Sequence, residues 1–183
     1  VILKRIEQFM KDAPLRHDFL MHHQERKKIP SRLGNDVLDA YFSEIRETSL
    51  CNDNEIDHDL NIVYTPLHGV GRDYFLRALK ERGFNTVHVV EEQGEPDGHF
   101  PTLSFPNPEE ENTLDLAHQK AKKLGCAWVF ANDPDADRLQ LSCLDDKNEF
   151  RKLTGNEMGA ILGYFVIEKA LKKGLKPLVA SSI

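Results

Sequence analysis

Three aspartates at alternate positions are the residues whose types and spacing could do chemistry. Asp133, Asp135 and Asp137 follow the apolar run 127–130 and precede Arg138. Carboxylates about 4 Å apart repel one another by roughly 4 kcal/mol at an effective dielectric near 20, so three converging carboxylates need a cation or a proton. Ligand sets made only of oxygen suit a hard cation, Mg²⁺ first. The pattern therefore predicts a Mg²⁺ site, provided that the loop brings the three side chains together.

Convergence requires the loop to curl. In an extended strand, residues two apart are separated by about 6.5 Å, which is too wide to close on one small ion. Pro134 fixes its own φ and restricts the backbone of Asp133, which limits how far the carboxylates can spread. An acidic loop with three carboxylates that point separately into water is the alternative interpretation of this spacing.

Other acidic sites fit the loop less well or remain open. A calcium-binding EF-hand loop that began at Asp133 would need Gly at its sixth position and Glu at its twelfth, but Arg138 and Leu144 stand there. A haloacid-dehalogenase-like phosphatase has D-x-D at the end of a buried strand, as Asp133-Pro134-Asp135 would be, and it stays open. A non-catalytic metal-binding module is a further alternative.

The elements that must position the loop alternate between strands and helices. We expect strands at 61–65, 86–90, 127–131 and 139–144, and an exit strand at 178–180. Helices are expected at 1–10, from Asn35, around Tyr74 to Leu79, at 108–124 and at 154–173, the last with a capping box at Thr154 and Glu157. This order predicts an α/β fold with a small mixed four-stranded sheet packed with helices, antiparallel around the acidic loop.

Two features flank these elements. Gly69-Val70-Gly71, between the first strand and its helix, could offer N–H groups to a phosphate or simply make a tight turn. Pro108 and the acidic run 109–111 have the composition of a first helical turn, which is why we expect the next helix to begin there.

The composition is typical of a soluble globular protein. The chain has 183 residues, of which 40% are hydrophobic and 30% charged, and a net charge of −6 argues against a nucleic-acid partner. No apolar stretch approaches the 18 or so residues of a membrane span, and three cysteines without C-x-x-C spacing predict reduced thiols. We therefore expect a cytoplasmic protein with no membrane partner.

Taken together, the motifs resemble the α-D-phosphohexomutase superfamily of phosphoglucomutases and phosphomannomutases, most closely its phosphoglucomutase/phosphopentomutase branch. Four ordered segments carry the resemblance, namely 61–71, 107–110, 133–138 and 153–157, and the helix at 37–41 is similar to the one that leads into the family's second domain. The resemblance implies a fold of the phosphohexomutase domain II type.

The resemblance also implies a domain order. Residues 1–58 would be the C-terminal part of domain 1 with its connecting helix, 59–175 the metal-binding domain 2, and 176–183 the start of domain 3. We expect the chain to be a piece of a longer enzyme whose remaining domains are its partners.

By the same resemblance, the enzyme would interconvert a sugar 1-phosphate and 6-phosphate, or a pentose 1- and 5-phosphate. The route passes through a phosphoserine and a bisphosphorylated sugar, which also serves as activator. Asp133, Asp135 and Asp137 would bind Mg²⁺, and Arg138 would be catalytic by balancing phosphate charge. The family's T-A-S-H-N-P serine loop does not occur in this chain. The piece alone is therefore expected to be inactive, and its motifs do not distinguish glucose, mannose and pentose phosphates.

Overall fold

The computed structural model describes residues 34–51 and 56–180, which divide into two compact units. The first unit ends at Glu47 and the second begins at Thr48. The short helix expected at 1–10 lies outside the described residues.

The described part of the first unit is one helix. α3 (Asn35–Thr48) begins where the sequence predicts a helix. Phe42 is buried, whereas Val37 and Tyr41 on the same apolar face are exposed. The helix is confirmed, but only one residue of its expected apolar face is buried.

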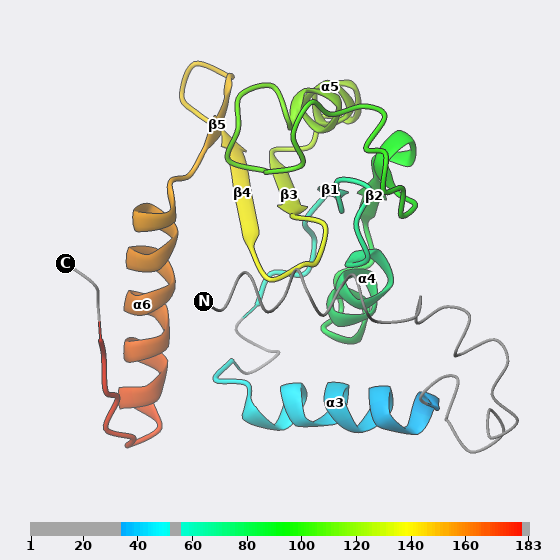
Figure 1. Cartoon of the computed structure of the whole chain (residues 1–183). Helices are drawn as coiled ribbons and strands as arrows, with labels where there is room; N and C mark the ends of the chain where they lie inside the picture. The colour runs from blue at the N-terminus through cyan, green and yellow to red at the C-terminus, as the bar shows by residue number, and fades with distance from the viewer. Residues whose placement is uncertain (1–33, 52–55, 181–183) are drawn as a thin grey trace, which may run out of the picture. The chain divides into compact units, whose positions relative to one another are not determined.

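One mixed sheet forms the centre of the second unit (Figure 1). Its strand order is β2-β1-β3-β4-β5, with β1 parallel to both β2 and β3, and with β4 antiparallel to both β3 and β5. The strands are β1 (Ile62–Thr65), β2 (Val87–Val89), β3 (Trp128–Asn132), β4 (Leu139–Leu144) and β5 (Phe150–Lys152). The predicted mixed sheet, antiparallel around the acidic loop, is confirmed.

The sheet has five strands rather than the four expected from the sequence. The fifth strand arises from a tight turn in which the Asp145 carboxylate accepts hydrogen bonds from the N–H groups of Lys147 and Glu149, both at 2.9 Å. Asn148 adopts a left-handed conformation with φ of 63°. The turn returns β5 along β4, and a strand of three residues is too short to show an alternating pattern in the sequence.

Two helices cover the sheet, α4 (Arg72–Glu81) and α5 (Asp115–Leu124). Val63 of β1 shares a buried cluster with Ala117 and Ala121 of α5. The next residue, Tyr64, instead stacks on Phe75 of α4, with ring centroids 4.0 Å apart. Because neighbouring residues of a strand point to opposite sides, the two helices lie on opposite faces of the sheet.

α5 begins at Asp115, so the prediction that this helix starts at Pro108 is wrong. Asn112 has a φ of 63°, which interrupts any helix that enters from the preceding turn. The Lys152 ammonium donates hydrogen bonds to the carbonyl oxygens of residues 108–110, at 2.5–3.4 Å. These carbonyl oxygens accept hydrogen bonds from a lysine of β5, and their segment does not form the first turn of a helix.

The long loop that follows β2 is tied to the end of β1. It opens with a single 3-10 turn, η3 (Glu91–Gln93). The Gln93 side chain is fully buried, accepts a hydrogen bond from the Thr65 hydroxyl at 2.7 Å and donates one to Thr102 Oγ1 at 3.0 Å. A buried amide with both ends bonded fixes the loop against the strand.

α6 (Gly155–Lys172) begins with the predicted capping box. The Glu157 N–H donates to Thr154 Oγ1 at 3.3 Å, and the Thr154 N–H donates to the Glu157 carboxylate at 2.8 Å. That backbone hydrogen bond, helped by a hydrogen bond from Arg151, lowers the pKa of Glu157 to about 2. The carboxylate therefore stabilises the cap fully above pH about 4.5, and this contribution is lost as the pH falls towards 2.

Several large apolar side chains of α6 are exposed, namely Ile161, Leu162, Tyr164, Phe165, Val166 and Leu171. Within the described ranges, no helix is long and apolar enough to cross a membrane.

Residues 178–180 form no strand, and Leu178 is 99% exposed, so the predicted exit strand is wrong for this structure. A strand needs a neighbour to pair its backbone groups, and none of the described strands pairs with these residues.

We predict that Thr154→Ala destabilises α6 by about 1 kcal/mol, because it removes the acceptor for the Glu157 N–H. The melting temperature, followed by circular dichroism, should fall by about 2–4 °C. Thr86→Ala is the control, since this exposed threonine lies outside the helices. Equal melting temperatures for the two variants would contradict a capping role for Thr154.

Candidate metal centre

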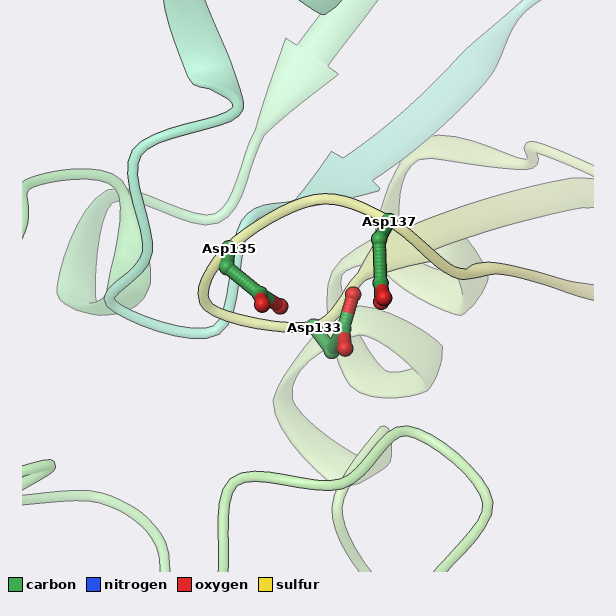
Figure 2. A group of neighbouring side chains, drawn as sticks. All are labelled: Asp133, Asp135 and Asp137. Carbon is green, nitrogen blue, oxygen red and sulfur yellow. The ribbon is translucent and has the colours of Figure 1, made fainter.

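The three aspartates converge. Asp133, Asp135 and Asp137 lie on the loop that joins β3 to β4, and each offers a carboxylate oxygen within 4.8 Å of the others, as Figure 2 shows. In the described part of the chain, this is the one group of at least three acidic, histidine or cysteine side chains with such spacing. The alternative of three carboxylates that point separately into water does not hold in this structure.

The curl that the sequence required comes from a turn within the loop. The Ala136 N–H donates to the Asp133 carbonyl oxygen at 3.0 Å, and Ala136 has a left-handed φ of 61°. Such a conformation costs a non-glycine residue of the order of 1 kcal/mol, so the surroundings must hold it. The turn brings the first and third carboxylates of the loop to the same side.

Asp133 is the buried member of the group, at 3% exposure, whereas Asp135 and Asp137 are exposed. Burial alone would raise the pKa of Asp133, but hydrogen bonds from the side chain and backbone of Arg138 outweigh it and leave the pKa below its ordinary value. The pKa of Asp137 is raised by its contact with the Asp133 carboxyl and by the charges of Asp135 and Asp133. The raised pKa of Asp137 reflects crowded negative charge, which a bound cation would relieve.

Arg138 is held on two sides. Its N–H and Nε–H donate to the two carboxylate oxygens of Asp133, at 3.0 and 2.8 Å, and its Nη1 donates to Asn107 Oδ1 at 3.1 Å. Nε also lies 3.8 Å from an oxygen of Asp137. The side chain is 47% exposed, so the guanidinium is oriented by the loop and still reachable from solvent.

The glycine loop, residues 69–71, packs against the acidic loop, residues 133–138. The Val70 N–H donates a hydrogen bond to the Pro134 carbonyl oxygen at 2.9 Å, and the Gly69 N–H donates one to the Pro66 carbonyl oxygen at 2.7 Å. A Cβ on Gly69 would lie 2.3 Å from the Pro134 Cα atom. The close approach of two backbones explains the glycine, and the two amides are engaged within the protein instead of being free for a phosphate.

The sequence predicts the acidic residues and Arg138 as site residues, but it indicates no role for the residues that support them. The unpredicted supports are Asn107, which binds Arg138, Gly69, which touches Pro134, and Asn132, which closes the loop through a hydrogen bond to the Arg138 carbonyl at 2.7 Å. Of these supports, only the loop with Gly69 and Gly71 was visible as a motif in the sequence. An asparagine in an N-P pair or next to an aspartate has too many ordinary uses to be assigned from sequence.

We predict that Gly69→Ala disrupts the acidic loop, because the new methyl group meets backbone that has no rotamer by which to move away. Overpacking of this kind costs about 1–3 kcal/mol, to be measured by urea denaturation. Gly98→Ala is the matched control, since no atom lies within 4 Å of its added Cβ. Equal stability of the two variants would contradict the close contact of the two loops.

Comparison with known proteins agrees with this fold. Residues 39–146 match the family model described as phosphoglucomutase/phosphomannomutase, alpha/beta/alpha domain II. A probable phosphomannomutase from Haemophilus influenzae is 41% identical over 137 residues, which cover 75% of this chain and 27% of that protein. A phosphopentomutase from Mus musculus is 36% identical over 73% of this chain and 21% of the relative.

Further relatives fall in the same group. A glucose 1,6-bisphosphate synthase from Mus musculus is 35% identical over 73% of this chain and 22% of its own length. The crystal structure of a phosphoglucomutase/phosphomannomutase family protein from Burkholderia thailandensis superposes with a TM-score of 0.55 at 23% identity, over 73% of this chain and 26% of that one, and so shares the fold. The chain thus spans about a quarter of the length of these relatives. The matched region contains β1 to β4 and the acidic loop, and the chain belongs to the phosphoglucomutase/phosphomannomutase family.

Proposed function

We propose that this chain is the metal-binding part of a phosphohexomutase or phosphopentomutase. The observation that carries the proposal is the convergence of Asp133, Asp135 and Asp137 beside an oriented Arg138, in a chain that matches the family's second domain. The relatives are named as mutases or as a bisphosphate synthase, which favours a sugar phosphate as substrate. They do not favour the haloacid-dehalogenase-like alternative.

The donor set fits Mg²⁺. Three carboxylates supply only oxygen atoms, which a hard cation prefers. Their separation of up to 4.8 Å is close to the about 4.2 Å between opposite ligands of an ion with bonds of about 2.1 Å. When bound, Mg²⁺ would neutralise charge on a phosphoryl oxygen during transfer.

The chain's own residues would orient the phosphate. The Arg138 guanidinium is fixed through Nε and the backbone by Asp133 and through Nη1 by Asn107. Its hydrogen bond with Asp133 raises the pKa of Arg138, so the cation persists at any working pH. A planar guanidinium can hold two phosphate oxygens at once, which places positive charge where negative charge develops.

The proposed reaction of the whole enzyme moves a phosphoryl group from a phosphoserine to a sugar monophosphate and returns the other phosphate of the bisphosphorylated intermediate to the serine. The proposed domain limits remain 1–58, 59–175 and 176–183, and the family match at 39–146 overlaps the central part. A bisphosphorylated sugar as activator, the remaining domains as partners and a cytoplasmic location are parts of the same proposal.

The metal assignment is tested by isothermal titration of Mg²⁺ into the 183-residue chain. We expect one ion per chain, and binding at least tenfold weaker in Asp135→Asn, which removes one negative ligand and keeps the shape. Asp146→Asn, in the turn between β4 and β5, removes an exposed carboxylate outside the group and should bind as the wild type does. Equal heats from all three proteins would refute the assignment.

Arg138→Lys tests the phosphate role in the full-length enzyme. A lysine keeps the charge and loses the planar fork, so turnover on sugar phosphate should fall by roughly 10²-fold, the scale of losing one charge-stabilising donor. Arg151→Lys is the control. This arginine on β5 forms an ion pair with Glu157 at 2.7 Å and does not belong to the acidic group. Near-normal turnover in Arg138→Lys would reduce Arg138 to a partner of Asp133.

A further inference from the structure

A buried tyrosine beneath the acidic loop is not accounted for by the proposed function. Tyr64, on β1, is fully buried, and its ring stacks on Phe75 with an interplanar angle of 8°. Its hydroxyl donates a hydrogen bond to Asn132 Oδ1 at 2.9 Å. Burial raises the pKa of Tyr64 above its ordinary range, so the hydroxyl keeps its proton and remains a donor at neutral pH. The ring alone would fill this place in the core, so the hydroxyl requires a separate reason.

Asn132 transmits this hydrogen bond to the acidic loop. Its Nδ2 donates to the carbonyl oxygen of Arg138 at 2.7 Å, while its Oδ1 accepts from Tyr64. The amide satisfies both partners in only one orientation, since the oxygen must face a donor and the nitrogen an acceptor. The Arg138 carbonyl, which can only accept, sets this orientation, and the tyrosine hydroxyl holds the amide in it from the other side.

The place where Asn132 acts is the neck of the loop. Asn132 on β3 is paired with Leu139 on β4, so residues 133–138 are the six-residue connection between two antiparallel strands. At the same neck, the Arg138 N–H donates to Asp133 Oδ1 at 3.0 Å. A link to the Arg138 carbonyl thus fixes the residue that, through its N–H and Nε–H, holds the buried carboxylate.

Gly71 allows the α4 side of the fold to cover this link. A Cβ at Gly71 would lie 3.2 Å from the Tyr64 hydroxyl, 3.5 Å from Asn132 Oδ1 and 2.9 Å from Ala136 Cβ. The backbone therefore approaches the hydrogen bond and the turn of the loop at once. A polar pair that is covered in this way is costly to break, because each partner is left without a replacement.

We propose that Tyr64 is a positioning residue for the acidic loop, and that its hydroxyl, acting through Asn132, holds the neck of residues 133–138 closed. The consequence for metal binding rests on the proposed function, in which Asp133, Asp135 and Asp137 share one divalent cation. A closed neck keeps the buried and exposed carboxylates together before the cation arrives. The repulsion among them is then countered by the fold and does not have to be overcome during binding.

The test is Tyr64→Phe, which keeps the stacked ring and removes only the hydroxyl. Two quantities are measured on the 183-residue chain, namely the Mg²⁺ dissociation constant by titration and the hydrogen exchange of single amides by NMR without metal. We expect Mg²⁺ to bind about tenfold more weakly, as is typical for loss of an outer partner of a metal ligand. Exchange should be faster at Arg138 but unchanged at Val129, in the core of β3.

Two further variants separate positioning from general stability. Tyr74→Phe, on α4 and 48% exposed, is the matched control and should leave both quantities unchanged. Asn132→Ala breaks the same link from its other end and serves also if Tyr64→Phe folds poorly. Adding Tyr64→Phe to Asn132→Ala should weaken Mg²⁺ binding no further, because the two residues act through one path.

The outcomes separate this inference from the proposed function. A lower melting temperature in Tyr64→Phe, with wild-type Mg²⁺ affinity and wild-type exchange at Arg138, would make the hydroxyl a general structural group and overturn the inference. If the wild-type chain bound no Mg²⁺, the proposed function would fail, and the inference about Tyr64 would be decided by hydrogen exchange at Arg138 alone. Faster exchange confined to Arg138 and its loop would then still support the role of Tyr64, and unchanged exchange would overturn it.

Discussion

Mutual repulsion of three carboxylates is the constraint on which the rest of this structure depends. Asp133, Asp135 and Asp137 present oxygens within 4.8 Å of one another, and the raised pKa of Asp137 records the cost. Part of that cost is offset inside the chain, because Arg138 binds both oxygens of the buried member. Charge of this density persists only on a backbone that cannot relax, so the surroundings of the loop are as important as the loop itself.

The fold supplies this rigidity from three directions. β3 and β4 clamp the ends of the loop as an antiparallel pair, and the glycine loop after β1 contacts Pro134 backbone to backbone. Asn107 accepts a hydrogen bond from Nη1 of Arg138. The segment that follows Asn107 is fixed by the Lys152 ammonium, which donates hydrogen bonds to the carbonyl oxygens of residues 108–110. Each support comes from a different segment, and the segments meet because parallel β1 and β3 end at the same edge of the sheet.

The misplaced helix start shows how tertiary structure can override a local signal. Proline followed by acidic residues favours a first helical turn, and that preference amounts to about 0.3–1 kcal/mol for each favourable charge. A lysine from β5 offers three charge-assisted hydrogen bonds to the same carbonyls, which are worth more. The chain therefore keeps a turn at residues 108–110, where Asn107 can reach Arg138.

The sequence by itself determined the alternation of strands and helices, the capping box of α6 and the acidic loop as the place of the chemistry, because these features depend on neighbours within a few residues. It also indicated the family, through motifs of which three, at 61–71, 107–110 and 133–138, lie within the matched region 39–146. Only the tertiary structure decided the fifth strand, the true start of α5 and the supports of the loop. Tyr64 and Asn132 are 68 positions apart, and a hydrogen bond over such a separation exists only because two parallel strands bring them together. No periodicity or spacing in the chain encodes that distance.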